Sequence, residues 1–177
     1  MIVWLNGTFG CGKTTTTRAI LALEGTARLW DPEFVGYMLR PLLTDLPVHN
    51  FQDWPAWREI VVATGHALYR QTGQALIAPQ SVLNASYMRE IKDGFRARHV
   101  GFFEVLLDAP EEALAERIAK DTVESDNVRA WRREHLPLWV AERARMQREA
   151  DLVIDTILSS PQEAALTILR ATLNVEG

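Results

Sequence analysis

The chain has 177 residues, of which 47% are hydrophobic and 24% charged, and its formal net charge at pH 7 is −4. This length is typical of one domain with a real hydrophobic core, and the negative charge argues against broad nucleic-acid binding, which needs a basic face. No apolar run approaches the roughly 18–20 residues of a membrane-spanning helix, so we expect a soluble protein. The single cysteine cannot form an internal disulfide, and Met1 leads straight into an apolar run without a signal peptide, so we expect a cytoplasmic location.

Short apolar runs alternate with longer stretches of helical spacing along the whole chain. The apolar runs predict β-strands at residues 2–5, 27–30, 74–78, 100–107 and 152–154. The helical stretches are residues 15–23, 34–43, 56–71, 86–98, 110–120, 136–149 and 160–172. Residues 44–55 are predicted to be irregular and the charged residues 121–134 to be mobile. Five strands separated by helices predict a parallel sheet covered on both faces, and one α/β domain over residues 1–177.

Two helix starts carry capping signals. Ser86 is a candidate N-cap for the helix that begins there, with Glu90 close to the capping-box distance. Ser160, followed by a proline and by Glu163, predicts an N-cap, a first helical position and a capping-box carboxylate for the last helix.

The first strand runs directly into a glycine-rich loop. Residues 7–14 read Gly-Thr-Phe-Gly-Cys-Gly-Lys-Thr and fit the pattern G-x-x-x-x-G-K-[ST] of a phosphate-binding P-loop at every fixed position. Its glycines let successive backbone N–H groups converge on a phosphate, Lys13 supplies a positive charge, and Thr14 offers a hydroxyl to Mg²⁺. Strand, loop and helix follow in the required order, so the sequence predicts a three-layer P-loop NTPase fold that binds ATP. The predicted ATP-binding residues are Gly7, Thr8, Phe9, Gly10, Cys11, Gly12, Lys13, Thr14 and Thr15.

Ligands of such sheets gather at the carboxyl ends of the strands, so the strand ends supply further candidates. Asp31 could accept a proton from an acceptor hydroxyl or hold Mg²⁺, or it could simply cap the helix that follows Pro32. Asp108 ends the fourth strand, where capping alone explains it, and the backbone around Thr156 could line an adenine pocket. The third strand ends at Gln80 without an aspartate, so no Walker-B carboxylate is evident there, and Gln80 remains a candidate substrate contact.

Arginines in the second half of the chain form another candidate group. Arg117 lies on the helix after the fourth strand, and Arg129, Arg132 and Arg133 lie in the charged segment beyond it. A kinase needs cations that close over the transferring phosphoryl group, so the last three are predicted catalytic residues of a lid at about residues 121–135. A solvated helix face with i,i+4 ion pairs is the alternative, and the sequence does not rank the two.

Aromatic residues cluster beside the irregular segment. An acceptor-binding region at about residues 34–72 would use large rings and a few polar groups. The substrate candidates are Phe34, Arg40, Phe51, Trp54, Trp57 and Arg58. The alternative is that these rings are core, because a chain with six tryptophans must bury several. His49 and His66 have no metal-ligand spacing and are interpreted as structural.

Three blocks of this sequence resemble the tunicamycin resistance protein family, and the similarity continues through residues 76–79. The blocks are residues 2–14, Trp30-Asp31-Pro32-Glu33 with Gly36 and Leu39-Arg40, and Phe51-Gln52-Asp53 with Pro55, Trp57 and Arg58. The similarity covers roughly the first half of the chain. More distantly, the layout resembles nucleoside monophosphate kinases and small kinases for shikimate, gluconate or chloramphenicol.

The resemblance implies ATP binding and resistance to tunicamycin, a uracil nucleoside that carries amino sugars and a fatty acyl chain. In the kinases, the residue at the position of Asp31 acts on the acceptor. The residue at the position of Arg40 is an arginine that binds the acceptor, and the residue at the position of Arg117 lies near the adenine. Longer members carry an amphipathic C-terminal extension associated with membranes. This sequence ends at Gly177 after a single helix, so we expect no such attachment.

Three functions are compatible with these residues. The first is an ATP- and Mg²⁺-dependent small-molecule phosphotransferase, with Lys13 on the phosphates and Asp31 on an acceptor hydroxyl. The second is a protein that sequesters the drug in a nucleotide-dependent way without phosphoryl transfer. The third is a housekeeping kinase for a nucleotide or sugar, for which drug resistance is incidental.

Overall fold

The computed structural model describes residues 1–122 and 125–173 of the chain. The strands form one five-stranded sheet in the order β2-β3-β1-β4-β5, and every pair of neighbouring strands is parallel. The strand bounds are β1 (Ile2–Asn6), β2 (Arg28–Leu29), β3 (Leu76–Pro79), β4 (Phe102–Asp108) and β5 (Leu152–Asp155). The predicted α/β P-loop architecture, with a five-stranded parallel sheet, is therefore confirmed.

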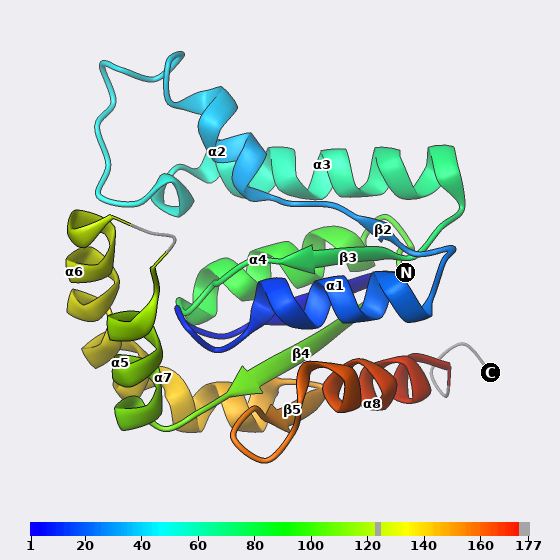
Figure 1. Ribbon diagram of the computed structural model, residues 1–177. Helices are drawn as coiled ribbons and strands as arrows, with labels where there is room; N and C mark the ends of the chain where they lie inside the picture. Colours follow the sequence, from blue (N-terminus) through cyan, green and yellow to red (C-terminus); the bar gives the residue numbers. More distant parts are fainter. Residues whose placement is uncertain (123–124, 174–177) are drawn as a thin grey trace.

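Helices surround this sheet (Figure 1). Their bounds are α1 (Lys13–Leu23), α2 (Glu33–Leu39), α3 (Pro55–Thr72), α4 (Ala85–Arg96), α5 (Glu111–Lys120), α6 (Asp126–Glu134), α7 (Leu136–Glu149) and α8 (Pro161–Leu173), with a 3₁₀ turn η1 (Phe51–Asp53). No helix within residues 1–122 and 125–173 is long and apolar enough to cross a membrane.

The side-chain alternation of β1 divides the core between the two faces of the sheet. Val3 and Leu5 join one apolar cluster, which contains residues of α1 and α8. Ile2 and Trp4 join the other, which contains residues of α3 and α4. Because β1 is buried on both faces, it reads as a continuous apolar run rather than as an alternating one.

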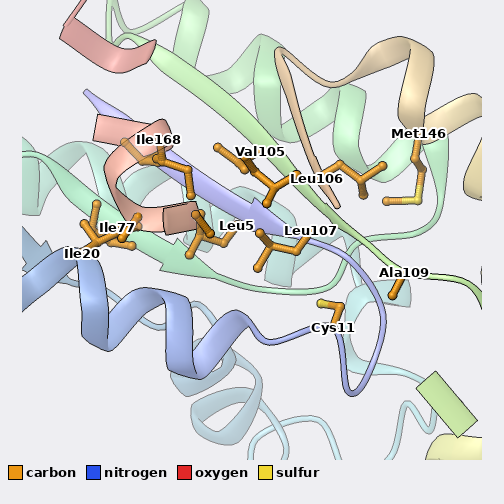
Figure 2. Packing of buried hydrophobic residues seen from close by; sticks show 14 of the residues in the cluster. Leu5, Cys11, Ile20, Ile77, Val105, Leu106, Leu107, Ala109, Met146 and Ile168 are labelled. Atoms are coloured by element: carbon orange, nitrogen blue, oxygen red, sulfur yellow. The ribbon is translucent and has the colours of Figure 1, made fainter. Parts of the chain in front are cut away.

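The cluster on the α1 and α8 side reaches the glycine-rich loop (Figure 2). The Cys11 side chain is fully buried in it, together with Leu107 of β4 and Ala109 just beyond that strand. The loop between β1 and α1 is thereby fixed to the core through one of its own side chains.

The structure differs from the predicted elements at three main places. The helix predicted at residues 34–43 ends at Leu39. Residues 126–134, predicted to be mobile, form helix α6, which begins after Ser125, whose hydroxyl accepts the Val128 N–H at 3.4 Å. The N-cap of α4 is Asn84 rather than Ser86, because the Asn84 Oδ1 accepts the N–H groups of Ser86 and Tyr87. Residues 123–124 of the predicted mobile segment, and the chain end at residues 174–177, lie outside the described residues.

The cap of the last helix is confirmed. The Ser160 Oγ accepts the Glu163 N–H at 3.3 Å, and the Glu163 carboxylate accepts the Ser160 N–H at 2.8 Å. This reciprocal pair is the capping box that the sequence predicts.

Candidate nucleotide and acceptor site

A cavity of about 1060 Å³ lies at the carboxyl ends of the strands, where α/β sheets usually bind ligands. Its volume is at the upper end of the usual range for ligand pockets, about 300–1,000 Å³. The glycine-rich loop and the start of α1 form one wall, α2 and η1 a second, the β3–α4 connection a third, and α5, α6 and the start of α7 a fourth.

The loop between β1 and α1 has a backbone that only glycine adopts readily. Gly7 has φ +134°, and a Cβ there would lie 2.6 Å from the Leu107 carbonyl oxygen and 2.7 Å from the Cys11 Sγ. Gly12, which precedes α1, has φ +96°. The backbone N–H groups of residues 10–14 have no hydrogen-bond partner among the described residues. Such open N–H groups at the start of a helix form an anion-binding cradle.

Lys13 and the following threonines lie beside this cradle. The Lys13 ammonium donates to the carbonyl oxygens of Gly7 at 3.1 Å and Thr8 at 2.8 Å, and it lies 5.9 Å from the centre of the Phe9 ring. Thr14 and Thr15 are exposed and line the cavity, whereas the Thr8 side chain is buried. The structure therefore brings Phe9, Gly10, Cys11, Gly12 and the predicted phosphate-binding side chains to one wall.

Arg117 joins this loop to the end of the sheet. Its guanidinium donates to the Gly10 carbonyl oxygen at 3.2 Å, the Thr156 Oγ1 at 3.0 Å and the Thr156 carbonyl oxygen at 2.7 Å. Arg117 and Thr156 both line the cavity. They lie together next to the glycine-rich loop, as expected of residues near a nucleotide base.

Asp108 has a structural environment rather than a place in the cavity. It is buried, receives two hydrogen bonds from Arg143 at 2.7 and 2.8 Å, and receives a third from Gln147 at 2.9 Å. Burial alone would raise its pKa, but the hydrogen bonds from Arg143 and Gln147 lower it. The carboxylate thus forms an ion pair with Arg143. The helix-capping role that its position before Ala109 and Pro110 suggests is not what the structure shows.

Two carboxylates at the end of β2 face the cavity. Asp31 accepts the Glu33 N–H at 2.9 Å through Oδ1, and no described residue donates to its Oδ2. Burial raises the pKa of Asp31, and burial followed by the charge of Asp31 raises the pKa of Glu33. The Tyr37 hydroxyl and the charges of Arg40 and Lys13 oppose the second shift. Asp31 therefore closes the turn and also lines the cavity, and its action on an acceptor or Mg²⁺ stays a prediction.

Helix α6 closes the cavity through aromatic contacts. The Trp131 ring lies 5.0 Å from Phe9 and 4.1 Å from His135, and His135 stacks on His49 with ring centres 5.8 Å apart. His49 belongs to the segment between α2 and η1, so its contact with His135 joins the fourth wall of the cavity to the second. His49 also lines the cavity, and its stacking on His135 is compatible with the structural role expected of it.

Only one of the three predicted lid arginines lines the cavity. The Arg132 guanidinium lies 5.5 Å from the Phe9 ring centre and donates to Asp121 at 2.9 Å. Arg129 instead donates to the Asp121 carbonyl oxygen and pairs with Asp126, while Arg133 is exposed on the outside of α6. The structure does not bring Arg129 and Arg133 to the phosphate cradle.

The structure also divides the predicted acceptor residues. Arg40, Phe51 and Gln80 line the cavity, and the Arg40 guanidinium lies 5.7 Å from the ring centre of Tyr37 and 5.9 Å from that of Phe51. Four of the predicted substrate residues, Phe34, Trp54, Trp57 and Arg58, do not line it.

These four positions are corrections with identifiable causes. Trp57 is 0% exposed and its indole N–H bonds the Pro32 carbonyl oxygen, while the Trp54 indole bonds that of Leu46. Phe34 is 68% exposed, on the outer side of α2. Arg58 is buried and already paired at 2.5 Å with both Glu90 and the Gln52 carbonyl oxygen.

Several cavity residues were missed. Some lie in irregular segments without a periodic signal, and others lie on helices, where helical spacing does not distinguish a cavity-facing residue from an exposed one. They are Glu33, Asn50, Gln52, Asp53, Ser81, Asn84, Tyr87, Trp131 and His135. Glu33 had a usable signal, since it stands two residues after Asp31 at the same strand end.

No protein-family model and no curated protein matches the sequence. Solved structures do match. A tunicamycin resistance protein from Deinococcus radiodurans superposes with a TM-score of 0.74 at 25% identity, over 97% of this chain and 94% of that one. Shikimate kinase from Acinetobacter baumannii, in complex with shikimate, has a TM-score of 0.64 at 19% identity, over 98% and 93%. An APS kinase from Mycobacterium tuberculosis, in complex with AMPPNP and APS, has a TM-score of 0.64 at 18% identity, over 97% and 96%.

The chain has the fold of these P-loop kinases. The resemblance to a tunicamycin resistance protein is confirmed over nearly the whole of both chains, beyond the first half on which the sequence blocks lie. The two kinases share the fold of this P-loop protein at lower identity.

Proposed function

We propose that the protein is an ATP-dependent phosphotransferase for a small molecule with a nucleoside or sugar part, and that it works in the cytoplasm. One observation carries this proposal: the cradle of open N–H groups with Lys13 shares a single cavity with the carboxylates of Asp31 and Glu33. Phosphate binding and hydroxyl activation are the two functions that a small-molecule kinase must combine.

In this proposal the nucleotide occupies the wall formed by the glycine-rich loop. The N–H groups of residues 10–14 and the Lys13 ammonium bind the β- and γ-phosphates, exchanging the carbonyl contacts of Lys13 for charge-assisted bonds. Arg117 and Thr156 border the base. Arg132, beside Phe9, is the arginine placed to neutralise charge on the transferring phosphoryl group. Arg129 and Arg133 are then residues of the lid itself, at about residues 121–135.

The residues fit a magnesium ion. The exposed Thr14 hydroxyl and the Asp31 Oδ2 are oxygen ligands on the same cavity, as Mg²⁺ prefers. When bound, Mg²⁺ supplies charge neutralisation between the phosphates. Residues 1–122 and 125–173 contain no group of three or more His, Cys, Asp or Glu side chains that could hold a metal ion.

On the acceptor side, a hydroxyl between Asp31 and Glu33 would donate its proton to one carboxylate while its oxygen approaches the γ-phosphate. The raised pKa of Glu33 brings it closer to neutral pH, where a general base is most effective. Asp31 orients the same hydroxyl. The similarity to a tunicamycin resistance protein makes tunicamycin the first acceptor to test.

Drug sequestration without chemistry is the second candidate function. Apolar side chains are exposed on α2 and the segment after it, at Phe34, Met38, Leu42 and Leu46, where an apolar ligand could bind. The third strand also ends without a carboxylate.

Mass spectrometry of the drug separates these two functions. The protein is incubated with ATP, Mg²⁺ and tunicamycin, and in parallel with a panel of nucleosides and sugars. A product heavier than one acceptor by one phosphoryl group, with equimolar ADP, supports phosphoryl transfer. Tunicamycin recovered unchanged, together with no phosphorylated product from the panel, would refute it.

A further inference from the structure

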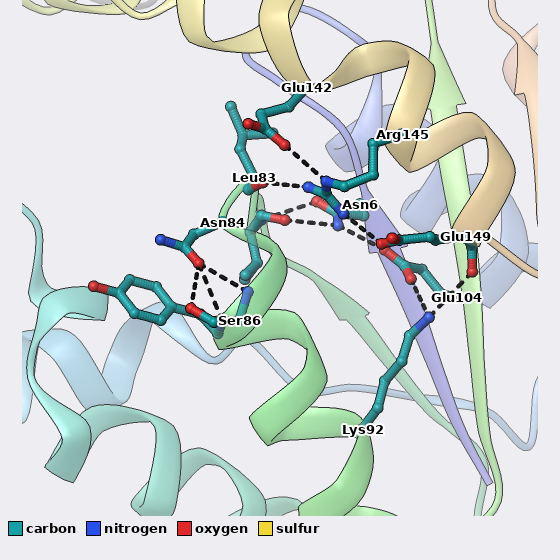
Figure 3. A network of polar contacts seen from close by, with 11 residues as sticks. Asn6, Leu83, Asn84, Ser86, Lys92, Glu104, Glu142, Arg145 and Glu149 are labelled. Carbon is teal, nitrogen blue, oxygen red and sulfur yellow. Dashed lines mark hydrogen bonds and ion pairs between the residues drawn. The ribbon is translucent and has the colours of Figure 1, made fainter.

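The β3–α4 connection is held rigidly at the edge of the cavity. The Asn6 side chain accepts the Val82 N–H at 2.9 Å and donates to the Val82 carbonyl oxygen at 3.0 Å and to Glu104 at 2.7 Å. The Arg145 guanidinium donates to the Leu83 carbonyl oxygen at 2.6 Å (Figure 3). Residues 80–84 therefore present a fixed surface rather than an adaptable loop.

Two buried carboxamides meet on this surface. Gln52 of η1 and Gln80 after β3 are 7% and 8% exposed, and both line the cavity. The Nε2 of each donates to the same oxygen, the Ser81 carbonyl, at 2.6 Å from Gln52 and 3.3 Å from Gln80. Because a carbonyl oxygen can only accept, both amide orientations are set by this contact.

The orientation leaves both Oε1 atoms as open acceptors. Neither receives a hydrogen bond from a described residue. Both are open to solvent, whereas the unpartnered hydroxyls of Thr8 and Thr17 are fully buried. Both residues line the cavity, so these two carboxamide oxygens are free to accept hydrogen bonds from donor groups of a ligand.

The charges on the same side of the cavity agree with this requirement. The carboxylates Asp31, Glu33 and Asp53 line it, against the single guanidinium of Arg40, whose charge acts on Glu33. Arg58, the other arginine nearby, is withdrawn from the cavity by its pair with Glu90. An anionic acceptor would therefore meet three carboxylates on this side against one guanidinium, a surplus of like charge that an uncharged or cationic acceptor avoids.

We propose that Gln52, Ser81 and Gln80 form a subsite for an uncharged or cationic acceptor rich in hydroxyl or amine groups, and that the acceptor side discriminates against anions. The donor groups of the ligand bind the two Oε1 atoms. The amide groups of Asn50 and Asn84, whose oxygens cap η1 and α4, offer N–H donors to the ligand's own oxygens. This inference rests on the proposed function for the identity of the second ligand as an acceptor.

Matched probes test the charge preference on the whole protein saturated with AMPPNP and Mg²⁺. Each pair keeps one carbon frame and changes the charge: methyl shikimate against shikimate, and glucosamine or glucose against gluconate. Ligand-observed NMR at millimolar concentrations gives the dissociation constants. We expect the uncharged or cationic member of each pair to bind at least about tenfold more tightly, because the carboxylates on this side outnumber the guanidinium of Arg40. Anions that bind equally or better, or failure of every uncharged and cationic probe to bind, overturns the proposal.

A substitution tests the subsite itself. Gln80→Met keeps the side-chain length and removes the Oε1, so binding of the best uncharged probe should weaken about tenfold while AMPPNP affinity is unchanged. Gln71→Met, on the exposed side of α3, is the matched control and should change neither. Unchanged probe binding in a folded Gln80→Met protein contradicts the subsite. If the Gln80→Met protein does not fold, Gln52→Met is tested in its place.

The same samples keep the two proposals apart. Binding is measured with a nucleotide that cannot transfer its phosphoryl group, so it reports the subsite alone. If the probes bind with the predicted preference but ATP yields no phosphorylated product, the phosphotransferase proposal fails and the subsite stands.

Discussion

At the scale of single residues, we expect the loss of the Lys13 side chain to weaken nucleotide binding specifically. Lys13→Ala removes the one ammonium beside the open N–H groups of the loop. Loss of a charge-assisted bond to a phosphate should weaken AMPPNP binding by at least about tenfold. Calorimetric titration measures it, with Lys120→Ala, an exposed residue paired with Glu116, as the control. Equal affinities in the two variants would contradict the assigned role.

The raised pKa values of Asp31 and Glu33 give a prediction for stability. A carboxyl group whose pKa is higher in the folded than in the unfolded state binds more protons when folded, so its contribution to stability falls as the pH rises above about 4. Glu33→Gln removes that loss while keeping the size of the side chain. We expect the variant to melt higher than the wild type at pH 7, with the difference shrinking toward pH 4. Thermal melts of both proteins at both pH values test this prediction. A lower melting temperature of Glu33→Gln than of the wild type at pH 7 would contradict it, because the Glu33 charge would then stabilise the fold.

Trp57 shows where a residue-level prediction from sequence failed. It belongs to the sequence block that carries the family resemblance, yet its ring is core, packed 5.3 Å from Phe51. Trp57→Ala should therefore lower the free energy of unfolding by about 3–5 kcal/mol, the usual cost of a large buried ring. Urea unfolding measures this loss. A folded variant of wild-type stability that loses only acceptor binding would restore the pocket interpretation.

At the scale of elements, helix α6 is the part that the sequence left least determined. Its many charges suggested a mobile segment, but Val128, Trp131 and Arg132 line the cavity from it. The first four strand–helix units were predictable because their periodicity and the loop pattern are local signals. The position of α6 depends on ring contacts with Phe9 and His49, which lie more than 80 residues away in the chain.

These contacts predict a role for α6 in holding the nucleotide. Trp131→Ala removes the ring that packs on Phe9 of the glycine-rich loop, an aromatic contact of about 0.5–1.5 kcal/mol. AMPPNP affinity should fall about two- to tenfold. Phe34→Ala, which removes an exposed ring outside the cavity, should leave it unchanged. If titration finds no difference between these variants, α6 does not contribute to nucleotide binding in this way.

At the scale of the whole molecule, one arrangement follows from a parallel sheet. Its strands all end at the same edge, so Asp31, Gln80 and the loop after β1 must share a cavity although they are far apart in sequence. That much was predictable from strand ends. The division among the aromatic residues was not, because helical spacing places Trp57 and Phe34 equally well in a core or a pocket, and only packing against β1 and β3 distinguishes them.

The number of acceptor molecules modified by each protein molecule tests the central claim most directly. The protein at limiting concentration is incubated with excess ATP, Mg²⁺ and tunicamycin or the best acceptor of the panel, and phosphorylated product is counted against total protein by mass spectrometry. The account predicts many phosphorylated molecules per protein, and a rate about 10²-fold lower in Asp31→Asn, the usual effect of losing a group that orients a reacting hydroxyl. Drug that is bound at most one to one and recovered unmodified, with no product from any acceptor, would contradict it.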